Sequence, residues 1–267
     1  MRQGLHLYLR LMGAHVRAQM QYKLSFVADV LSTLLGMLLE FASVWVLFTH
    51  IAALGGWSFP EVAFLYGTAE LSLSLAQMLT SGFDYLPEAV RWGQFDSVLI
   101  RPRGLFFQVL ASRLSMRRFG RALQGVFVLA LALSWLDPSW DFGRWLFLGW
   151  TVLGGTLLFA GLFVVGATSS FWTVESLEVF NILTYGGSTL ISYPLSIYSE
   201  WLRNVFLFVV PLGFANFYPA LFLLGKDDPF GLPDFMPFLS VPLCALVFLL
   251  SLWFWRFGVR HYQSTGN

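Results

Sequence analysis

The sequence predicts an all-α protein that crosses a membrane several times. Hydrophobic residues make up 57% of its 267 residues and charged residues only 12%, whereas an ordinary soluble domain is roughly one quarter charged. The mean hydropathy is +0.68, and several apolar runs approach the ~20 residues that a helix needs to cross the hydrocarbon core. A soluble fold could not bury so much apolar surface, so we expect one membrane domain over residues 1–267.

Six transmembrane helices are predicted from these apolar runs. They are Leu24–Phe48, Glu61–Thr80, Phe119–Leu136, Trp145–Phe171, Val174–Ser192 and Leu239–Trp255. The third run is short, but the arginines that precede it can keep their charged groups at the membrane surface while their stems lie in lipid. Short polar turns join the spans, and neither an internal repeat nor a soluble domain is visible.

The fifth span has two possible interpretations. In the first, Val174–Ser192 crosses the membrane and Pro194–Gly225 forms a broken, re-entrant hairpin on the outer side. In the second, Asn204–Leu224 crosses and Val179–Ser192 is re-entrant on the inner side. Non-helical backbone is tolerated at membrane depth where protein or a water-filled cavity surrounds it. Both interpretations place the termini on the same side, and we favour the first.

Residues 1–22 are expected to form an amphipathic helix on the membrane surface. Arg2, Arg10 and Arg17 alternate there with apolar residues at helical spacing. A cleavable signal peptide would instead carry a short apolar run followed by a small-residue cleavage site.

Basic residues predict the orientation of the chain. They gather in the N-terminal segment, in the loop 82–118 between the second and third spans, and after the last span. They are Arg2, Arg10, Arg17, Lys23, Arg91, Arg101, Arg103, Arg113, Arg117, Arg118, Arg121, Arg256 and Arg260. We therefore expect the protein to lie in the inner membrane. The positive-inside rule predicts that both termini and the loop are on its cytoplasmic side.

Motifs for nucleotide binding or hydrolysis are missing. The sequence lacks a GxxxxGK[ST] phosphate loop, an HExxH pair and a GxSxG elbow. Its histidines are scattered, and its single cysteine, Cys244, lies in an apolar stretch. We expect no catalytic, cofactor-binding or metal site in this chain, so any ATP-driven work must be powered by another subunit.

A short helix is predicted within the loop 82–118. Its signals are a cap at Asp84, a first-turn proline at Pro87, an acidic residue at Glu88, a basic residue at Arg91 and a stop at Gly93. We expect this helix, Tyr85–Trp92, to lie parallel to the membrane. Leu86, Val90 and Trp92 would then offer an apolar contact to something in the cytoplasm.

The loop continues with a pattern that resembles a known family. Gly93-Gln94-Phe95-Asp96 is followed by Leu99-Ile100-Arg101-Pro102. This is similar to the first cytoplasmic loop of ABC-2-type ABC transporter permeases, in the bacterial branch with a G-x-h-D-x-x-L-h-R-P pattern, where h is hydrophobic. Further similarities cover nearly the whole chain, in the family's order: Phe171-Trp172 after the fourth span, Tyr193-Pro194 after the fifth, then Val210-Pro211 and Tyr218-Pro219-Ala220.

The resemblance implies a six-span permease with a type V exporter-like fold. Two such subunits, identical or related, would surround a translocation path in membrane lipid. Residues Asp84–Trp92 would form a coupling helix that contacts ABC ATPase subunits, which bind the ATP and Mg²⁺. The segment Pro194–Gly225 would be the outer gate, with Tyr193 at its start and breaks at Pro194, Pro211 and Pro219. No nucleic-acid partner is implied.

Acidic residues within the predicted spans are costly in lipid, so they should face protein or water. They are Asp29, Glu40, Glu70, Glu175 and Glu178. Glu40 and Glu70 lie deepest and are the better candidates for substrate or proton sites. Interhelical hydrogen bonding is the more usual role for such residues.

The leading functional prediction is the permease subunit of an ATP-driven exporter, with an apolar or amphipathic substrate. One alternative is an ion-coupled secondary transporter, which would have paired broken helices in two halves of the chain. Another is a non-catalytic membrane scaffold. Co-purification of an ATP-hydrolysing protein would distinguish the first from the other two.

Overall fold

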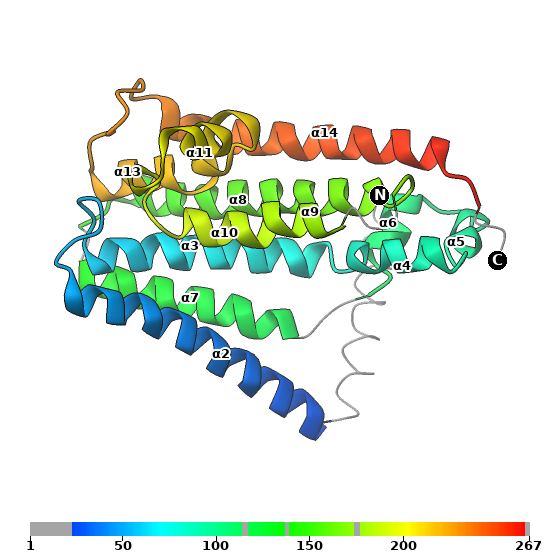
Figure 1. The fold of residues 1–267 in the computed structure, drawn as a ribbon, viewed down its shortest axis with the longest axis horizontal. Helices are drawn as coiled ribbons and strands as arrows, with labels where there is room; N and C mark the ends of the chain where they lie inside the picture. Colours follow the sequence, from blue (N-terminus) through cyan, green and yellow to red (C-terminus); the bar gives the residue numbers. More distant parts are fainter. Residues whose placement is uncertain (1–22, 114–116, 137–138, 174–176, 265–267) are drawn as a thin grey trace.

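The computed structural model describes residues 23–113, 117–136, 139–173 and 177–264 (Figure 1). All regular secondary structure in these residues is helical, and no strand occurs among them. The amphipathic helix predicted for residues 1–22 lies outside the described residues.

A row of long helices forms the body of the protein (Figure 1). They are α2 (Lys23–His50), α3 (Phe59–Leu79), α7 (Arg117–Leu136), α8 (Phe142–Ser169) and α14 (Ser240–His261). Helix α3 packs between α7 and α8, while α14 packs on α8 and α2 packs on α7. The order across the bundle is therefore α2, α7, α3, α8, α14.

Four of the described helices are long and apolar enough to cross a membrane. They are Phe59–Leu79, Arg118–Leu136, Phe142–Ser169 and Met236–His261. These match the predicted second, third, fourth and sixth spans. Helix α2 occupies the position of the predicted first span, and its part Leu38–His50 is a shorter apolar helix.

Local signals explain where the helices begin and how closely they pack. The N–H of Ser58 donates to the Glu61 carboxylate at 2.7 Å, which closes a capping box at the start of α3. Asp141 accepts from the N–H of Arg144 at 3.1 Å at the start of α8. A Cβ on Gly67 would lie 2.8 Å from the Leu129 nitrogen, so the absence of a side chain there permits the close contact of α3 with α7.

A shorter helical segment runs beside α3 and α8 (Figure 1). It consists of α9 (Leu177–Asn181), a π-helical turn at Ile182–Gly186 and α10 (Gly187–Ile191). Its apolar part, Val179–Ile191, is shorter than a full span. π-Helical turns within helices often mark functional positions.

The next segment is bent and lies at one end of the bundle (Figure 1). It contains α11 (Glu200–Asn204) with a π-helical turn at Val205–Val209, then α12 (Leu212–Ala215) and α13 (Phe217–Leu224). The two halves, Glu200–Val209 and Leu212–Leu224, meet at 70°, which is the geometry of a broken span or a re-entrant loop.

The break between α12 and α13 lies at Asn216, and the predicted break at Pro219 was wrong. Pro219 is the third residue of α13. Backbone N–H groups in the first turn of a helix have no helical partner, so a proline there costs no hydrogen bond. Asn216 is buried and donates to the carbonyls of Leu65 at 2.9 Å and Ile191 at 2.8 Å. Thr68 donates to its side-chain oxygen at 2.5 Å. One amide thus links the broken segment to both α3 and the end of α10.

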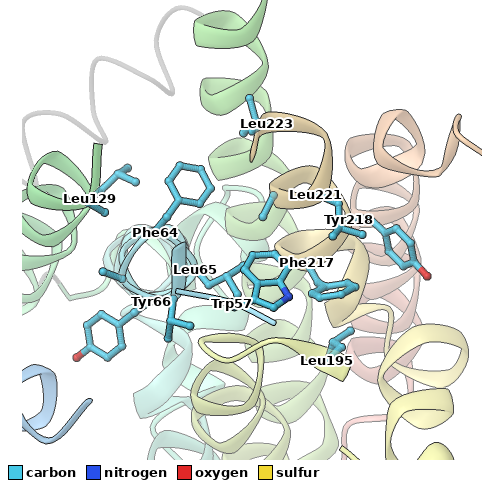
Figure 2. Close-up of a cluster of buried hydrophobic side chains, with 14 of the residues drawn as sticks. Trp57, Phe64, Leu65, Tyr66, Leu129, Leu195, Phe217, Tyr218, Leu221 and Leu223 are labelled. Carbon is cyan, nitrogen blue, oxygen red and sulfur yellow. The ribbon is translucent and has the colours of Figure 1, made fainter. Parts of the chain in front are cut away.

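A cluster of large, buried apolar side chains lies at this end of the bundle (Figure 2). Trp57 and Phe217 lie with their ring centroids 5.6 Å apart, and Phe64 and Leu65 of α3 belong to the same buried cluster. The bent segment is therefore held by packing as well as by Asn216.

Replacing Asn216 with Ala should destabilise the protein by about 1–3 kcal/mol, because the Ile191 carbonyl and the Thr68 hydroxyl would lose buried partners. Thermal unfolding in detergent would measure the change. Asn204→Ala, at an exposed position of α11, is the matched control and should have little effect. Equal effects of both variants would contradict the role of Asn216.

Candidate functional site

The part of the loop that the structure describes before α7, residues 82–113, contains a 3₁₀ turn and then three short α-helices, at the end of the bundle opposite to the bent segment (Figure 1). They are α4 (Leu86–Arg91), α5 (Asp96–Leu99) and α6 (Leu105–Leu110). Helix α4 matches the predicted helix to within one residue at each end. Pro87 lies in its first turn, and Gly93 adopts a φ of +66°, which ends it sharply.

Asp84 does not cap α4 as predicted. It lies in the 3₁₀ turn Phe83–Tyr85 that precedes the helix, and its carboxylate is ion-paired with the guanidinium of Arg118. Arg118 also donates to the Gln77 carbonyl at the end of α3. Burial raises the pKa of Asp84, and the nearby Arg118 charge opposes this increase. The ion pair therefore ties the start of the loop to the first turn of α7.

The apolar side of α4 faces the protein itself, which corrects a second prediction. Leu86 is 2% exposed and Val90 is 6% exposed, and Pro87 is also buried. Leu86 and Val90 belong to a cluster with Val164 of α8 and Trp255 of α14. Leu86 and Val90 are therefore unavailable to a partner, because they hold α4 against two long helices.

Phe95 is the centre of an aromatic group that we call the aromatic box: Phe95, Phe171, Trp255 and Tyr262. The Phe95 ring is 1% exposed. Its centroid lies 5.3 Å from Phe171, 6.4 Å from Trp255 and 5.0 Å from Tyr262, and the last two contacts are edge-to-face. The box joins the loop to the end of α8 and to the last turns of α14.

Asp96 adds a polar contact beside the aromatic box. The Tyr262 hydroxyl donates to one carboxylate oxygen at 3.0 Å, and the Ser264 hydroxyl donates to the other at 2.5 Å. Burial and the Asp96 carboxylate raise the pKa of Tyr262 to about 12, so the phenol stays protonated and can donate at neutral pH. The Phe95-Asp96 pair thus fastens the loop to the segment that follows α14.

The second half of the loop pattern lies at the surface. Leu99, Ile100, Arg101 and Pro102 are exposed, and Ile100 most of all. Leu99 is the last residue of α5, and the other three begin the turn that leads to α6. Only the first half of the pattern is therefore used in holding the loop to the bundle.

Helix α4 presents an accessible surface of mixed character, which we call the exposed face of α4: Tyr85, Glu88, Arg91 and Trp92. Trp92 is 59% exposed, and Tyr85, Glu88 and Arg91 are also exposed. The guanidinium of Arg113 lies 3.8 Å from the Tyr85 ring centroid, so a second part of the loop supports this face. Aromatic and arginine side chains on a rigid helix suit a protein–protein contact.

At the opposite end, Tyr193 and Pro194 lie just before the bent segment, and Pro211 lies at its bend. Pro194 is buried and precedes the 3₁₀ turn Leu195–Ile197, and Pro211 directly precedes α12. An ion pair that sequence reasoning missed lies nearby, where the Lys226 ammonium contacts Glu61 at 2.8 Å. Lys226 also lies 5.0 Å from the Trp57 ring centroid, so it holds the end of α13 over the start of α3.

Glu40 and Glu70 lie within electrostatic range of each other. Glu40 is exposed on α2, whereas Glu70 on α3 lies close to Arg121 and to Ser188 of α10. Gln124 of α7, which sequence reasoning missed, is buried beside Tyr66, and Tyr66 lies within electrostatic range of Glu70. Glu70 therefore lies in a polar region between α3, α7 and α10.

The described residues contain no group of three or more His, Cys, Asp or Glu side chains that could hold a metal ion. The main feature of this site is structural, because a small, partly exposed helix is fixed to the ends of long apolar helices. The fold and this site define a multispanning helical membrane protein.

Comparison with known protein families identifies the group to which the chain belongs. Residues 34–266 match the ABC-2 family transporter proteins, so the chain is a member of the ABC-2 transporter family. The predicted resemblance is confirmed, and the protein is a permease-type transmembrane protein with a role in transport. Neither the curated proteins nor the solved structures gave a match to the chain.

The contact between Asp96 and Tyr262 can be tested by a double-mutant cycle. Asp96→Ala and Tyr262→Phe should show a coupling energy of about 0.5–1.5 kcal/mol in thermal unfolding, because each change removes the same hydrogen bond. Asp96→Ala combined with Tyr198→Phe should be additive, since the Tyr198 hydroxyl donates to Leu190 in a different part of the chain. Additivity in the first cycle would show that Tyr262 does not hold Asp96.

Proposed function

We propose that this protein is the permease subunit of an ABC exporter driven by a separate ATPase subunit. The observation that carries the proposal is the exposed face of α4, displayed on a loop whose other side is buried against α8 and α14. Membership of the ABC-2 transporter family supports it. In this proposal the ATP and Mg²⁺ bind to the ATPase, and this chain supplies the membrane path.

The distribution of charge supports an orientation with the loop in the cytoplasm. Arg91, Arg101, Arg103 and Arg113 belong to the loop, and Arg256 and Arg260 lie at the end of α14. These segments gather at one end of the bundle (Figure 1). The positive-inside rule then places that end, and both termini, on the cytoplasmic side of an inner membrane.

We expect the aromatic box to transmit motion of the loop to α8 and α14. Closure of two ATPase subunits around ATP would push or pull whatever they contact at the inner surface. Because α4 packs on α8, and Phe95 is enclosed by Trp255 of α14 and by Tyr262, the loop would move as one body with these helices. A flexible loop would absorb the same motion locally.

The bent segment is suited to the outer gate of a six-span permease. In this arrangement α2 is the first span, residues 177–191 form a short fifth span, and 194–225 forms the re-entrant gate. The position of 177–191 beside α3 and α8, and of α11 to α13 at one end, supports this interpretation (Figure 1). The described residues contain one bent helix pair, whereas a secondary transporter of the inverted-repeat type would have two.

The transport complex would contain two permease subunits, identical or related, with the path at their interface. Exposed apolar side chains on α2, such as Leu31, Leu35 and Leu39, leave a long face of this helix for lipid or a second subunit. A path with such walls suits an apolar or amphipathic substrate.

Trp92→Ala should abolish stimulation of the partner ATPase while the permease still folds, because the Trp92 ring lies on the surface and contributes little to the core. The measurement is ATP hydrolysis by the reconstituted complex, together with co-purification of the two subunits. We expect a loss of tenfold or more, on the order of the effect of an interface hot spot.

Trp201→Ala is the matched control, because Trp201 is 69% exposed but lies on α11 at the opposite end. It should leave ATPase stimulation and co-purification intact. Normal coupling in the Trp92 variant would overturn the assignment of α4 as the ATPase contact.

A further inference from the structure

An open surface pocket, which we call the cavity, lies between α6 and the last turns of α14. Its volume is about 370 Å³, and its lining is mainly apolar. The lining includes Leu105, Phe106, Phe107, Trp255, Arg256 and Arg260. Phe106 packs against Trp255, with ring centroids 6.2 Å apart, so the floor of the cavity is continuous with the loop core around Phe95.

The rim of the cavity is strongly basic. Arg256 and Arg260 are one helical turn apart on α14, and both are exposed. Arg101 and Arg103 are exposed in the turn just before Gly104, which also lines the cavity. Among the residues that the structure describes, no acidic side chain lines it. An apolar floor beneath a cluster of guanidinium groups is complementary to a ligand with an anionic head and an apolar tail.

The position of the cavity matches the boundary of the membrane. It adjoins the last turns of the apolar helix Met236–His261, where that helix acquires its two arginines. Trp253 and Phe257 are exposed on the same turns, and aromatic side chains at the end of a span mark the headgroup region. A lipid could therefore enter the cavity from the bilayer without leaving its leaflet.

We propose that this cavity binds an anionic phospholipid. The phosphate lies between Arg256 and Arg260, and an acyl chain lies along Phe106, Phe107 and Val259. Because α6 follows α5 in the loop, the lipid would brace the loop against α14 next to the aromatic box, with which it shares Trp255. The site does not depend on the ATPase, and it can be tested on the permease alone.

A lipid fits the cavity better than an acidic surface of a protein. Apolar residues supply most of its lining, and an acyl chain fills such a space, whereas an acidic protein surface would leave its floor unfilled. A free phosphate ion would use the arginines but not the floor. The experiment separates these occupants.

The test is the amount of phosphatidylglycerol that the purified full-length protein retains from mixed vesicles of phosphatidylglycerol and phosphatidylcholine, measured by native mass spectrometry. The unmodified protein should retain phosphatidylglycerol selectively. Arg256→Gln with Arg260→Gln should reduce retention by about tenfold or more, since each basic residue near an anionic lipid surface contributes a factor of about five. Val259→Trp should reduce it as well, because it fills the cavity without changing the charge.

The control variant also loses two arginine charges, but at the opposite end of the bundle. Arg144→Gln with Arg203→Gln should retain phosphatidylglycerol normally, and size-exclusion chromatography would confirm folding of each variant. Equal loss in the control, no preference over phosphatidylcholine, or undiminished binding by Val259→Trp would overturn the proposal. So would displacement of the lipid by millimolar inorganic phosphate, which would indicate a simple anion site.

Discussion

Burial of the Phe95 ring is the contact on which the organisation of the loop end depends. Phe171, Trp255 and Tyr262 enclose the ring, and together they connect the loop to the last turns of α8 and α14. Full burial of one phenylalanine contributes about 1.5–3 kcal/mol, and edge-to-face contacts add to this. Leu86 and Val90 extend the same core beneath α4. The consequence is that the only parts of α4 left for another protein are its charged and aromatic edge residues.

The opposite end is organised by a different constraint, the need to satisfy backbone groups where helices break inside an apolar bundle. The carbonyl of Ile191 has no helical partner, because α10 ends there. The Asn216 side chain donates to it and to Leu65, so the break in one segment supplies the bond that another segment lacks. An unpaired backbone group in lipid costs several kcal/mol. The hydrogen bonds of Asn216 remove this cost, and they therefore allow the bent segment to lie there. The two ends thus combine packing with different polar contacts: carboxylates that accept from Arg118, Tyr262 and Ser264 at the first, and one buried amide at the second.

Much of this architecture follows from local sequence. Apolar runs predicted four helices that the structure shows to be long and apolar enough to cross a membrane. The proline and glycine of α4 predicted its limits, because these signals act within a few residues. The errors concern tertiary partners. Asp84 resembles a helix cap in sequence, but Arg118, 34 positions later, takes its carboxylate. Leu86 and Val90 resemble an apolar docking surface, and only the packing of α8 and α14 shows that they point inward. Asn216 carried no sequence signal beyond being a polar residue in an apolar stretch.

The central claim is that the loop and α14 move as one body when ATP binds to the partner. Spin labels at Gln94→Cys, an exposed position just after α4 and outside the proposed ATPase contact, and at His261→Cys, with Cys244 replaced by Ser, would report the distance between the α4 region and the end of α14. The labelled subunit would be diluted into unlabelled protein in the reconstituted complex. The account predicts the same distance with and without ATP, although ATP changes the distance from α4 to a label on α2. A change of about 5 Å or more between α4 and α14 would contradict it, because the aromatic box would then not transmit the motion.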